Sequence, residues 1–248
     1  MSQESGIWGI IGGTGLTALD GLEIGSAEEM DTHWGAPSGP LQHGRYAGKP
    51  VVFLARHGNP HRIPPHEINY RANIRAMKDA GVSRIIAVNA VGSINNAMEP
   101  ASLVLPDQIV DYTWGRPQTF FEGSLESTTH IDFTWPYSAS LRRHLLGSAR
   151  EASTGLWDGG VYACTQGPRL ETAAEINRLE GDGCDLVGMT GMPEAALARE
   201  LGIEYVSLCL VVNWAAGKTE SEITLEEIQA NLEAGIGRVH ALLATCLA

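Results

Sequence analysis

The sequence predicts a single α/β domain, in which buried β-strands alternate with α-helices along the chain. Apolar runs rich in β-branched residues recur at intervals, and segments with helical periodicity lie between several of them. The 248 residues are enough for one domain with a sizeable core. With 44% hydrophobic residues and 29 glycines, the composition is that of a packed globular protein with many tight turns. We therefore expect residues 1–248 to form one domain.

Apolar segments rich in β-branched residues are expected to be mostly buried strands. They are residues 6–11, 50–55, 84–90, 103–111, 160–164, 185–189 and 203–212. Segments with apolar residues at helical spacing are expected to be helices. They are residues 70–80, 138–152, 171–179, 193–201 and 224–247. Residues 111–136 are aromatic, contain prolines and lack periodicity, and long loops of this kind are usually functional lids or interface elements.

Charge and cysteine content limit the partners and the compartment. A formal net charge of -12 would repel a nucleic-acid backbone or an anionic membrane surface, so any anionic ligand must meet a local positive site. The four cysteines form no CxxC pair and no Cys/His ligand pattern, which predicts reduced and mostly buried thiols. The sequence shows no signal-peptide core and no apolar stretch long enough to span a bilayer. These features predict a cytoplasmic protein.

A glycine-rich turn with the sequence GGTGL follows the first expected strand. Such a turn can direct backbone N–H groups and the Thr14 hydroxyl towards a phosphate, although a plain tight turn explains the same residues. Gly13, Gly15 and Ala18 also fit the dinucleotide-binding fingerprint loosely. That interpretation is weak, because no second strand delivers an acidic residue to the ribose at the expected distance.

Arg56 and His57 end the second expected strand and begin a basic segment that continues through His61 and His66. An arginine presents a fixed fork of donors suited to phosphate, and α/β folds collect ligands at strand ends. We therefore interpret this segment as an anion site. The alternative is that Arg56 pairs with a carboxylate and the histidines lie in a solvated loop. Metal binding by the histidines is less favoured, because no carboxylate or cysteine completes a usual ligand set.

Other strand ends carry small or polar residues at which a ligand can be bound. Asn89 and Ala90 lie where a ligand can approach backbone amides closely. Met189 can line a sugar or base, and Thr190 can reach an anion, the alternatives being a core methionine and a helix cap. Asn213 ends the last strand, and its amide can donate and accept at once and so bridge two edge atoms of a base. A capping role is the alternative for Asn213.

The motifs are modest individually, but they form a specific ordered set. They are GGTGL, ARHG followed by HxxxPxxxNYxAN, NAVGSI, TQGPRLET and GMTGMPEAALARELGI. Over about residues 6 to 230, the chain resembles the purine nucleoside phosphorylases and methylthioadenosine phosphorylases. The resemblance implies a central mixed β-sheet flanked by helices and a homotrimeric assembly. It also implies phosphorolysis of a purine nucleoside, with inorganic phosphate as co-substrate and with neither a metal nor another cofactor.

The resemblance assigns roles to particular residues of this chain. The implied phosphate site consists of Thr14, Arg56, His57, Asn89, Ala90 and Thr190. The implied nucleoside site consists of Met189, Glu171, Thr172, Asn213, Ala215, Leu225 and His130. Glu171 and Met189 would face the ribose, and His130 would reach the 5′ pocket of the neighbouring subunit. The alternatives are a carboxylate in the first turn of a helix for Glu171 and an ordinary surface position for His130.

The resemblance also implies a catalytic role for Arg56, His57 and Asn213. Ribosyl transfer passes through a cationic sugar, so a phosphate held beneath C1′ by Arg56 and His57 both stabilises that charge and attacks it. The departing purine gathers negative charge, and a group near N7 and the 6-position must hydrogen-bond or protonate it. Asn213 is the residue expected to do so.

Asn213 and Ala215 depart from the adenine-specific pattern, in which two aspartates are expected at these positions. An aspartate accepts a hydrogen bond from a 6-amino group, but its ionised carboxylate would face a 6-oxo group acceptor to acceptor. Asparagine can donate to O6 and accept from N7–H. With Ala215 removing the second acceptor, a 6-amino group would remain unpaired at a cost of about 1–3 kcal/mol. We therefore expect hypoxanthine or guanine as the base.

Apolar residues are expected at the other end of the substrate. Ile223, Leu225 and Ile228 open the last expected helix, and the resemblance implies that Leu225 lies near the 5′ substituent. An apolar wall favours a methylthio group over a hydroxyl. The expected base site and the expected 5′ site together predict S-methyl-5′-thioinosine as the substrate. Inosine or guanosine and methylthioadenosine are alternative substrates within the same chemistry. A nicotinamide-dependent oxidoreductase and a non-catalytic nucleoside-binding protein are the alternatives from other classes.

Overall fold

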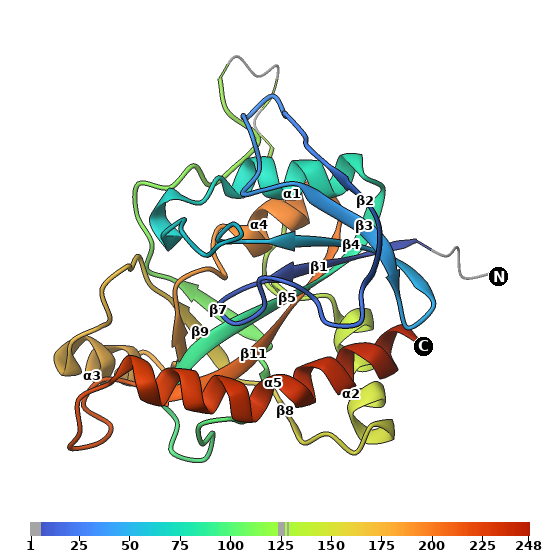
Figure 1. The fold of residues 1–248 in the computed structure, drawn as a ribbon. Coiled ribbons are helices and arrows are strands. Elements are labelled where there is room, and N and C mark those ends of the chain that lie inside the picture. The colour runs from blue at the N-terminus through green and yellow to red at the C-terminus, as the bar shows by residue number, and fades with distance from the viewer. Residues whose placement is uncertain (1–5, 124–126, 128) are drawn as a thin grey trace.

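The computed structural model describes residues 6–123, 127 and 129–248. Within these residues, eleven strands form one mixed sheet, and five α-helices pack around it (Figure 1). Helices α5 (Leu225–Leu247) and α2 (Ala139–Glu151) pack against each other on one side of the strands, and α1 (Tyr70–Asp79) and α4 (Glu194–Glu200) pack against each other on the other side. The predicted single α/β domain with a mixed sheet is confirmed.

Strand β5 (Val82–Ser93) is the centre of the sheet. Strands β1 (Ile7–Gly12) and β11 (Glu204–Trp214) pair with it in parallel, and β4 (Lys49–Ala55) pairs in parallel with β1. Strand β10 (Leu186–Gly188) pairs with the end of β5 in antiparallel fashion. The carboxyl ends of β1, β4, β5 and β11 therefore meet at one edge, which is where ligands bind in α/β sheets.

The outer strands extend this centre in two directions. The order β2-β3-β4-β1-β5-β10-β9-β7 forms one path, and β11 leads through β6 to β8 on a second path. The remaining bounds are β2 Glu23–Glu28, β3 Leu41–Tyr46, β6 Leu103–Leu105, β7 Gln108–Asp111, β8 Leu156–Asp158 and β9 Val161–Cys164. Helix α3 (Ala173–Gly181) packs against β9 and β10 through Ile176 and Leu179.

The predicted helices form where the sequence indicates them, with shifts at their ends that have local causes. Helix α1 begins after Asn69, whose side chain accepts a hydrogen bond from the Ala72 N–H, and it ends before Gly81, whose φ is +81°. Its buried face includes Ile74 and Met77, and full burial of such side chains contributes about 1.5–3 kcal/mol each. Helix α3 begins two residues later than predicted, because Thr172 and Glu175 form a reciprocal capping box.

The predicted strand at residues 103–111 is two strands with different partners. Leu103–Leu105 pairs with β11 and β8, whereas Gln108–Asp111 pairs with β9. The chain turns between them, at Pro106 and Asp107, and one uninterrupted strand cannot join both neighbours. Strands β2, β3 and β8 were not predicted. Every residue of β2 is exposed, so it has no apolar face from which a strand can be recognised.

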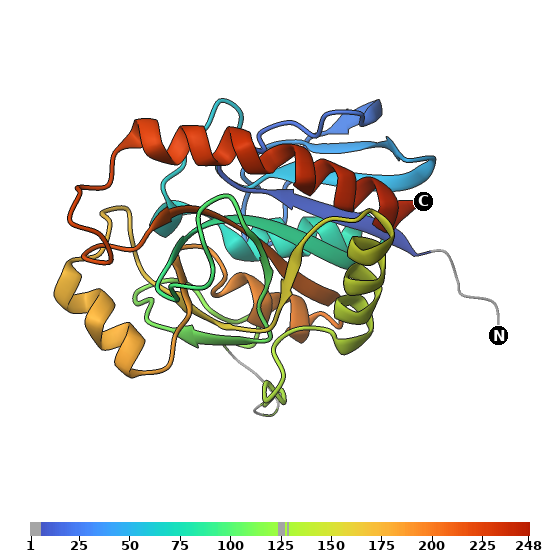
Figure 2. The ribbon, with the colours of Figure 1, turned by 90° about the horizontal axis from the view of Figure 1, so that it is seen from below.

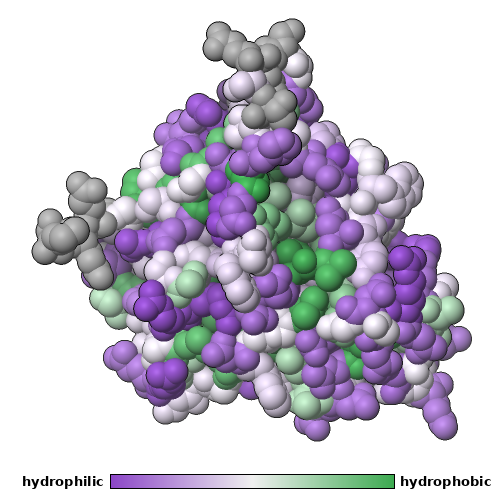
Figure 3. All heavy atoms as spheres, turned by 180° about the vertical axis from the view of Figure 1, so that it is seen from behind, coloured by the Kyte–Doolittle hydropathy of each residue, from purple (hydrophilic) through white to green (hydrophobic). Residues whose placement is uncertain are grey.

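The molecule has a mostly hydrophilic face and buried free cysteines, as the composition indicates. Figure 2 shows α5 lying along the sheet with its C-terminal end beside α2, and Figure 3 shows a face that is mostly hydrophilic with small hydrophobic groups. All four cysteines are free and buried, as predicted, and burial raises the thiol pKa of Cys164 and Cys209 to about 12. Among the described residues, none of the helices has the length and apolar character needed to cross a membrane.

Candidate active site

A cavity of about 230 Å³ lies at the edge where β1, β4, β5 and β11 end, beside β10. Its walls come from segments that are far apart in the sequence, and they include most of the residues singled out from the sequence. Those residues are Thr14, Arg56, His57, Ala90, Glu171, Met189, Thr190, Asn213, Ala215 and Leu225. The predicted site residues therefore gather in one place. The lining also contains residues that were not predicted as site residues, among them Pro65, Gly92 and Leu170.

Three predicted site residues do not line this cavity. Asn89 is buried behind Thr190, and its Oδ1 accepts a hydrogen bond of 2.9 Å from the Thr190 hydroxyl. Thr172 caps helix α3, where its Oγ1 accepts from the backbone N–H of Glu175. His130 is exposed in the loop between β7 and α2. Of these three residues, Asn89 is joined to a lining residue by a side-chain hydrogen bond.

Arg56 is fully buried and pairs with a carboxylate that sequence reasoning did not identify. Its Nε and Nη2 donate to the two carboxylate oxygens of Glu194 at 2.8 and 2.9 Å, and its Nη1 donates to the Val88 carbonyl at 3.1 Å. The Tyr205 hydroxyl donates to the same carboxylate at 2.8 Å. Burial opposes the Arg56 charge, but Glu194 outweighs this effect and raises the Arg56 pKa above its usual value.

The sequence left two interpretations of Arg56 open, an anion site and an ion pair with a carboxylate. Arg56 forms the ion pair and also lines the cavity, so the two interpretations are compatible. A guanidinium has five N–H donors, and the hydrogen bonds within the described residues leave one donor free on each Nη. The ion pair is formally neutral, so an anion bound here would be held by directed N–H groups more than by net charge. Gly13 keeps this space open, because a Cβ there would lie 2.9 Å from Arg56 Nη1 and 2.6 Å from the Val88 oxygen.

His57 is buried, and it is neutral at physiological pH. Burial and the nearby Arg56 charge lower its pKa to about 4. Its Nδ1 lies 2.8 Å from the Ile63 carbonyl oxygen, which can only accept, so Nδ1 carries the hydrogen and Nε2 keeps a lone pair. The His57 ring stacks on His61, with ring centroids 4.3 Å apart. His57 can therefore accept a hydrogen bond from a P–OH group.

The histidine-rich segment shows no cluster of potential metal ligands in the part of the chain that the structure describes. His61 and His66 are exposed, unlike His57. Within residues 6–123, 127 and 129–248, no three His, Cys, Asp or Glu side chains are arranged to hold a metal ion. The dinucleotide fingerprint also lacks its context, because β1 is followed by a turn and strand β2, not by a helix.

Asn213 enters the cavity through an irregularity in β11. Strand β11 pairs regularly with β5 up to Val211, and the register then shifts so that Asn213 lies opposite Gly92. Such bulges re-aim a side chain. Asn213 Nδ2 donates to the Trp214 carbonyl at 2.7 Å, which leaves the second N–H and Oδ1 for a ligand. Ala215 lines the same cavity, and its backbone N–H donates to the Ser93 carbonyl at 2.8 Å.

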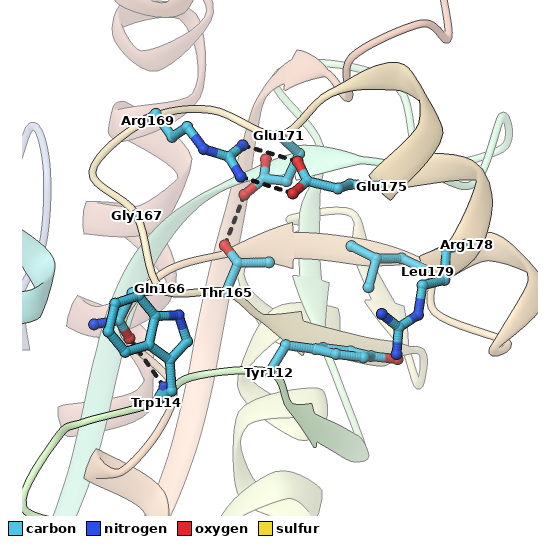
Figure 4. Close-up of a pocket in the computed structure, with 10 residues that line it drawn as sticks. All are labelled: Tyr112, Trp114, Thr165, Gln166, Gly167, Arg169, Glu171, Glu175, Arg178 and Leu179. Atoms are coloured by element: carbon cyan, nitrogen blue, oxygen red, sulfur yellow. Dashed lines mark hydrogen bonds and ion pairs between the residues drawn. The ribbon is translucent and has the colours of Figure 1, made fainter.

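Glu171 precedes helix α3 and is not a carboxylate of its first turn. Figure 4 shows Thr165 pointing at Glu171, and the Thr165 hydroxyl donates to Glu171 Oε1 at 2.7 Å. The other oxygen, Oε2, remains available as an acceptor. Glu171 also borders a second cavity of about 280 Å³, which is lined by residues of α3 and by Trp114. Neither Arg56 nor His57 lines this second cavity.

Comparisons with known proteins agree with this geometry. The family model described as "Phosphorylase superfamily" matches residues 8–248. A probable S-methyl-5′-thioinosine phosphorylase from Pseudomonas syringae is 59% identical over 241 residues, which cover 97% of this chain and 98% of that protein. A 6-oxopurine nucleoside phosphorylase from Pyrococcus furiosus is 44% identical, covering 88% of this chain and 83% of that protein. The structure of methylthioadenosine phosphorylase from Schistosoma mansoni in complex with adenine superposes with a TM-score of 0.92 at 31% identity, covering 97% of this chain and 90% of that chain.

Proposed function

The chain belongs to the phosphorylase superfamily, and from that premise we propose that it cleaves 6-oxopurine nucleosides with inorganic phosphate, S-methyl-5′-thioinosine being the preferred substrate. The products are hypoxanthine and 5-methylthioribose 1-phosphate. One observation carries the proposal. A single cavity is lined by Arg56 and His57, which follow β4, and by Asn213 and Ala215 at the end of β11 and just after it, where a carboxylate would be needed for a 6-amino purine. Relatives named as S-methyl-5′-thioinosine phosphorylases support the choice of substrate.

Phosphate binds in this proposal at Thr14, Arg56, His57, Ala90 and Thr190, with Asn89 orienting the Thr190 hydroxyl. The two free N–H groups of the Arg56 guanidinium donate to phosphate oxygens, and His57 Nε2 accepts from P–OH. A phosphate oxygen forms a bond to C1′ while the C1′–N9 bond breaks, and that electron pair leaves with the purine. The proton that hydrogen phosphate loses balances the proton that the base gains.

The base binds at Asn213 in this proposal. Its free N–H donates to O6, and its Oδ1 accepts from N7–H as negative charge develops on the purine. Ala215 supplies no acceptor for a 6-amino group. Glu171 Oε2 accepts from a ribose hydroxyl, and Met189 packs against the sugar. The preference for a 6-oxo base follows from the donor at Asn213 together with the missing acceptor at Ala215.

The 5′ end of the substrate lies near Leu225 in this proposal. Leu225 lines the cavity, yet 79% of its surface is exposed in the isolated chain. A large, exposed apolar side chain at the mouth of the cavity suits a methylthio group and a covering partner. We propose a homotrimer in which His130 reaches the 5′ pocket of the neighbouring subunit. The enzyme uses phosphate as co-substrate and no cofactor, and its four free thiols favour a reducing compartment such as the cytoplasm.

The test is a turnover assay with S-methyl-5′-thioinosine, inosine and methylthioadenosine, following release of the free base with and without phosphate. We expect phosphate-dependent cleavage, with the highest kcat/KM for S-methyl-5′-thioinosine. A highest kcat/KM for methylthioadenosine would contradict the assignment of Asn213 and Ala215. Absence of phosphate-dependent cleavage of all three nucleosides would contradict the proposed reaction.

A further inference from the structure

Arg116 lies in the long loop between β7 and α2, but unlike most of that loop it is buried, with only 6% of its surface exposed. Its guanidinium carbon lies 5.3 Å from the centroid of the Tyr70 ring. Among the described residues, no carboxylate forms an ion pair with it, in contrast to Arg56. A buried charge without an ion pair is costly unless its N–H groups are bonded. The hydrogen-bond acceptors that surround the Arg116 guanidinium in place of a carboxylate therefore indicate its role.

One set of partners flanks Thr190, at the phosphate end of the cavity. Nη1 of Arg116 donates to the Met189 carbonyl at 2.9 Å and to the Met192 carbonyl at 2.6 Å. These carbonyls lie on either side of the segment that carries the Thr190 hydroxyl. Hydrogen bonds from a charged donor are stronger than those between neutral groups. Arg116 therefore restrains the backbone on both sides of Thr190.

A second set of partners lies before Glu171. Nη2 of Arg116 donates to the Thr165 and Gln166 carbonyls at 3.3 and 2.8 Å, and Nε donates to Gln166 Oε1 at 3.2 Å. The backbone N–H of Trp114 donates to the same Gln166 side-chain oxygen (Figure 4). Thr165 in turn holds the Glu171 carboxylate through its hydroxyl. The same guanidinium thus restrains the segment that orients Glu171.

A third contact runs to the far wall of the cavity. Nη1 of Arg116 lies 3.2 Å from the Tyr70 hydroxyl oxygen, and that hydroxyl donates to the Pro65 carbonyl at 2.9 Å. Pro65 lines the cavity. One side chain therefore connects three walls that come from separate parts of the chain.

We propose that Arg116 is a positioning residue for the reaction: its planar fork of donors sets the distance between Thr190 at the phosphate and Glu171 at the nucleoside. This inference rests on the proposed function. Phosphorolysis requires two substrates to be held in attacking geometry, and a displacement of about 1 Å at a distance from the chemistry can cost on the order of 100-fold in rate. Arg116 does not line the cavity, so it acts through the backbone that it holds.

The experiment compares Arg116→Met with Arg142→Met. Arg142 is a matched control, because it also donates to two consecutive backbone carbonyls, those of Leu105 and Pro106, but lies on α2 and outside the cavity. Both variants are assayed with saturating S-methyl-5′-thioinosine and phosphate, at a temperature well below each measured Tm. We expect kcat to fall on the order of 100-fold in Arg116→Met and to change less than threefold in Arg142→Met. Equal kcat values in the two variants would overturn the proposal.

A conservative variant distinguishes the positioning role of the Arg116 guanidinium from the effect of its positive charge alone. In Arg116→Lys, a single ammonium keeps the charge but cannot reach the carbonyls on both sides. We expect Arg116→Lys to recover most of the lost Tm but to keep a kcat at least tenfold below that of the wild type. If lysine restores kcat together with Tm, then Arg116 has only a structural role. Arg116→Lys also provides the comparison if the methionine variant does not fold.

Hydrogen exchange tests the same inference without any assay of turnover. Amides in residues 165–171 and 188–192 are expected to exchange faster in Arg116→Lys than in wild type, and to exchange at wild-type rates in Arg142→Met. Unchanged exchange in both segments would contradict the role of Arg116. The exchange measurement does not require a nucleoside. If the wild-type protein cleaves none of the nucleosides, the proposed function is refuted, but hydrogen exchange still measures whether Arg116 restrains the backbone of residues 165–171 and 188–192.

Discussion

At the scale of single residues, the proposed selectivity for the base depends on two residues, Asn213 at the end of β11 and Ala215 just after it. We predict that the double variant Asn213→Asp, Ala215→Asp shifts preference from the 6-oxo to the 6-amino nucleoside. The new carboxylates supply acceptors for the amino group and face O6 acceptor to acceptor. A change of about 1–3 kcal/mol in pairing corresponds to a ratio of kcat/KM values altered by roughly 5- to 150-fold. The measurement is kcat/KM for methylthioadenosine and S-methyl-5′-thioinosine.

The two single variants serve as controls for this prediction. Asn213→Asp alone removes the donor to O6, and Ala215→Asp alone adds only the second acceptor, so each is expected to show part of the shift. A folded double variant with unchanged selectivity would show that neither residue contacts the base.

We predict that the free energy of unfolding depends on pH through His57, with a sign that follows from the lowered pKa of its imidazole. The folded-state pKa is about 4, and the ordinary value is 6.5, so the unfolded chain binds more protons between these two values. Stability therefore rises with pH across this window and is lost as pH falls from 6.5 towards 4. From pH 7 to pH 5, the contribution of His57 is expected to fall by about 2 kcal/mol.

Urea unfolding of the wild type and of His57→Gln at pH 7 and pH 5 measures this contribution. Glutamine does not titrate, so the variant should lose less stability than the wild type over the same interval. Partial burial also lowers the pKa of His61, which is present in both proteins. An identical loss in the two proteins would mean that His57 is not buried in its neutral form.

At the scale of elements, the shift of register in β11 and the absence of a side chain at Gly92 together set the place of Asn213. A Cβ at Gly92 would lie 3.2 Å from Asn213 Nδ2 and 3.2 Å from Val187 Cγ1, closer than ordinary packing. We predict that Gly92→Ala displaces the amide and raises the KM for the nucleoside on the order of tenfold, equivalent to about 1.4 kcal/mol. The KM for phosphate should stay within twofold, because Arg56 follows β4 and not β5 or β11.

Gly237→Ala is the matched control for Gly92→Ala. Gly237 lies in α5, and a Cβ added there would have no neighbouring atom within 4 Å, so alanine should stabilise the helix by about 0.5–1 kcal/mol and leave both KM values unchanged. If Gly92→Ala behaves like this control, then the position of Asn213 does not depend on the missing side chain.

Sequence patterns predicted the elements that carry buried apolar faces and missed those that do not. Strands β5 and β11 are apolar over most of their length, and both were predicted. Strand β2 is exposed throughout and β8 has only three residues, so neither has a periodicity that can be recognised. The pairing of β5 with β1, β10 and β11 depends on contacts between distant segments, which local pattern does not contain.

The same limit applies to the candidate site. Motifs at strand ends predicted Arg56, Thr190 and Asn213, because ligands gather where parallel strands end. Glu194 and Arg116 were missed. A carboxylate in the first turn of a helix is ordinarily explained by the helix dipole, and an arginine in a long loop by solvation, so neither residue carries a local signal. Their partners lie far away in the sequence, and only the fold brings them together.

At the scale of the whole molecule, the proposed trimer would complete the end of the cavity that we assign to the 5′ substituent. Leu225 at the cavity mouth is largely exposed, and His130 is exposed without lining the cavity of its own chain. A cyclic trimer repeats one heterologous contact, so each subunit can give His130 to one neighbour and receive it from the other. Sedimentation analysis is expected to give a trimer, and a monomer at assay concentration would contradict this part of the proposal.

Mixed trimers test whether the site is shared between subunits. In the proposed site, Arg56→Ala removes N–H donors to phosphate, and His130→Ala removes the side chain that reaches the neighbouring subunit. Each variant alone should therefore have low activity on S-methyl-5′-thioinosine. When the two are co-expressed, some cavities combine an intact Arg56 with an intact His130 from the adjacent subunit, and the specific activity should exceed that of either variant. Co-expression of Arg56→Ala with Asn213→Ala is the control, because both residues line the cavity of one chain and no mixed assembly restores them together. Absence of recovery in the test pair would mean that His130 acts within its own subunit or not at all, and recovery in the control would mean that Arg56 and Asn213 do not serve the same cavity.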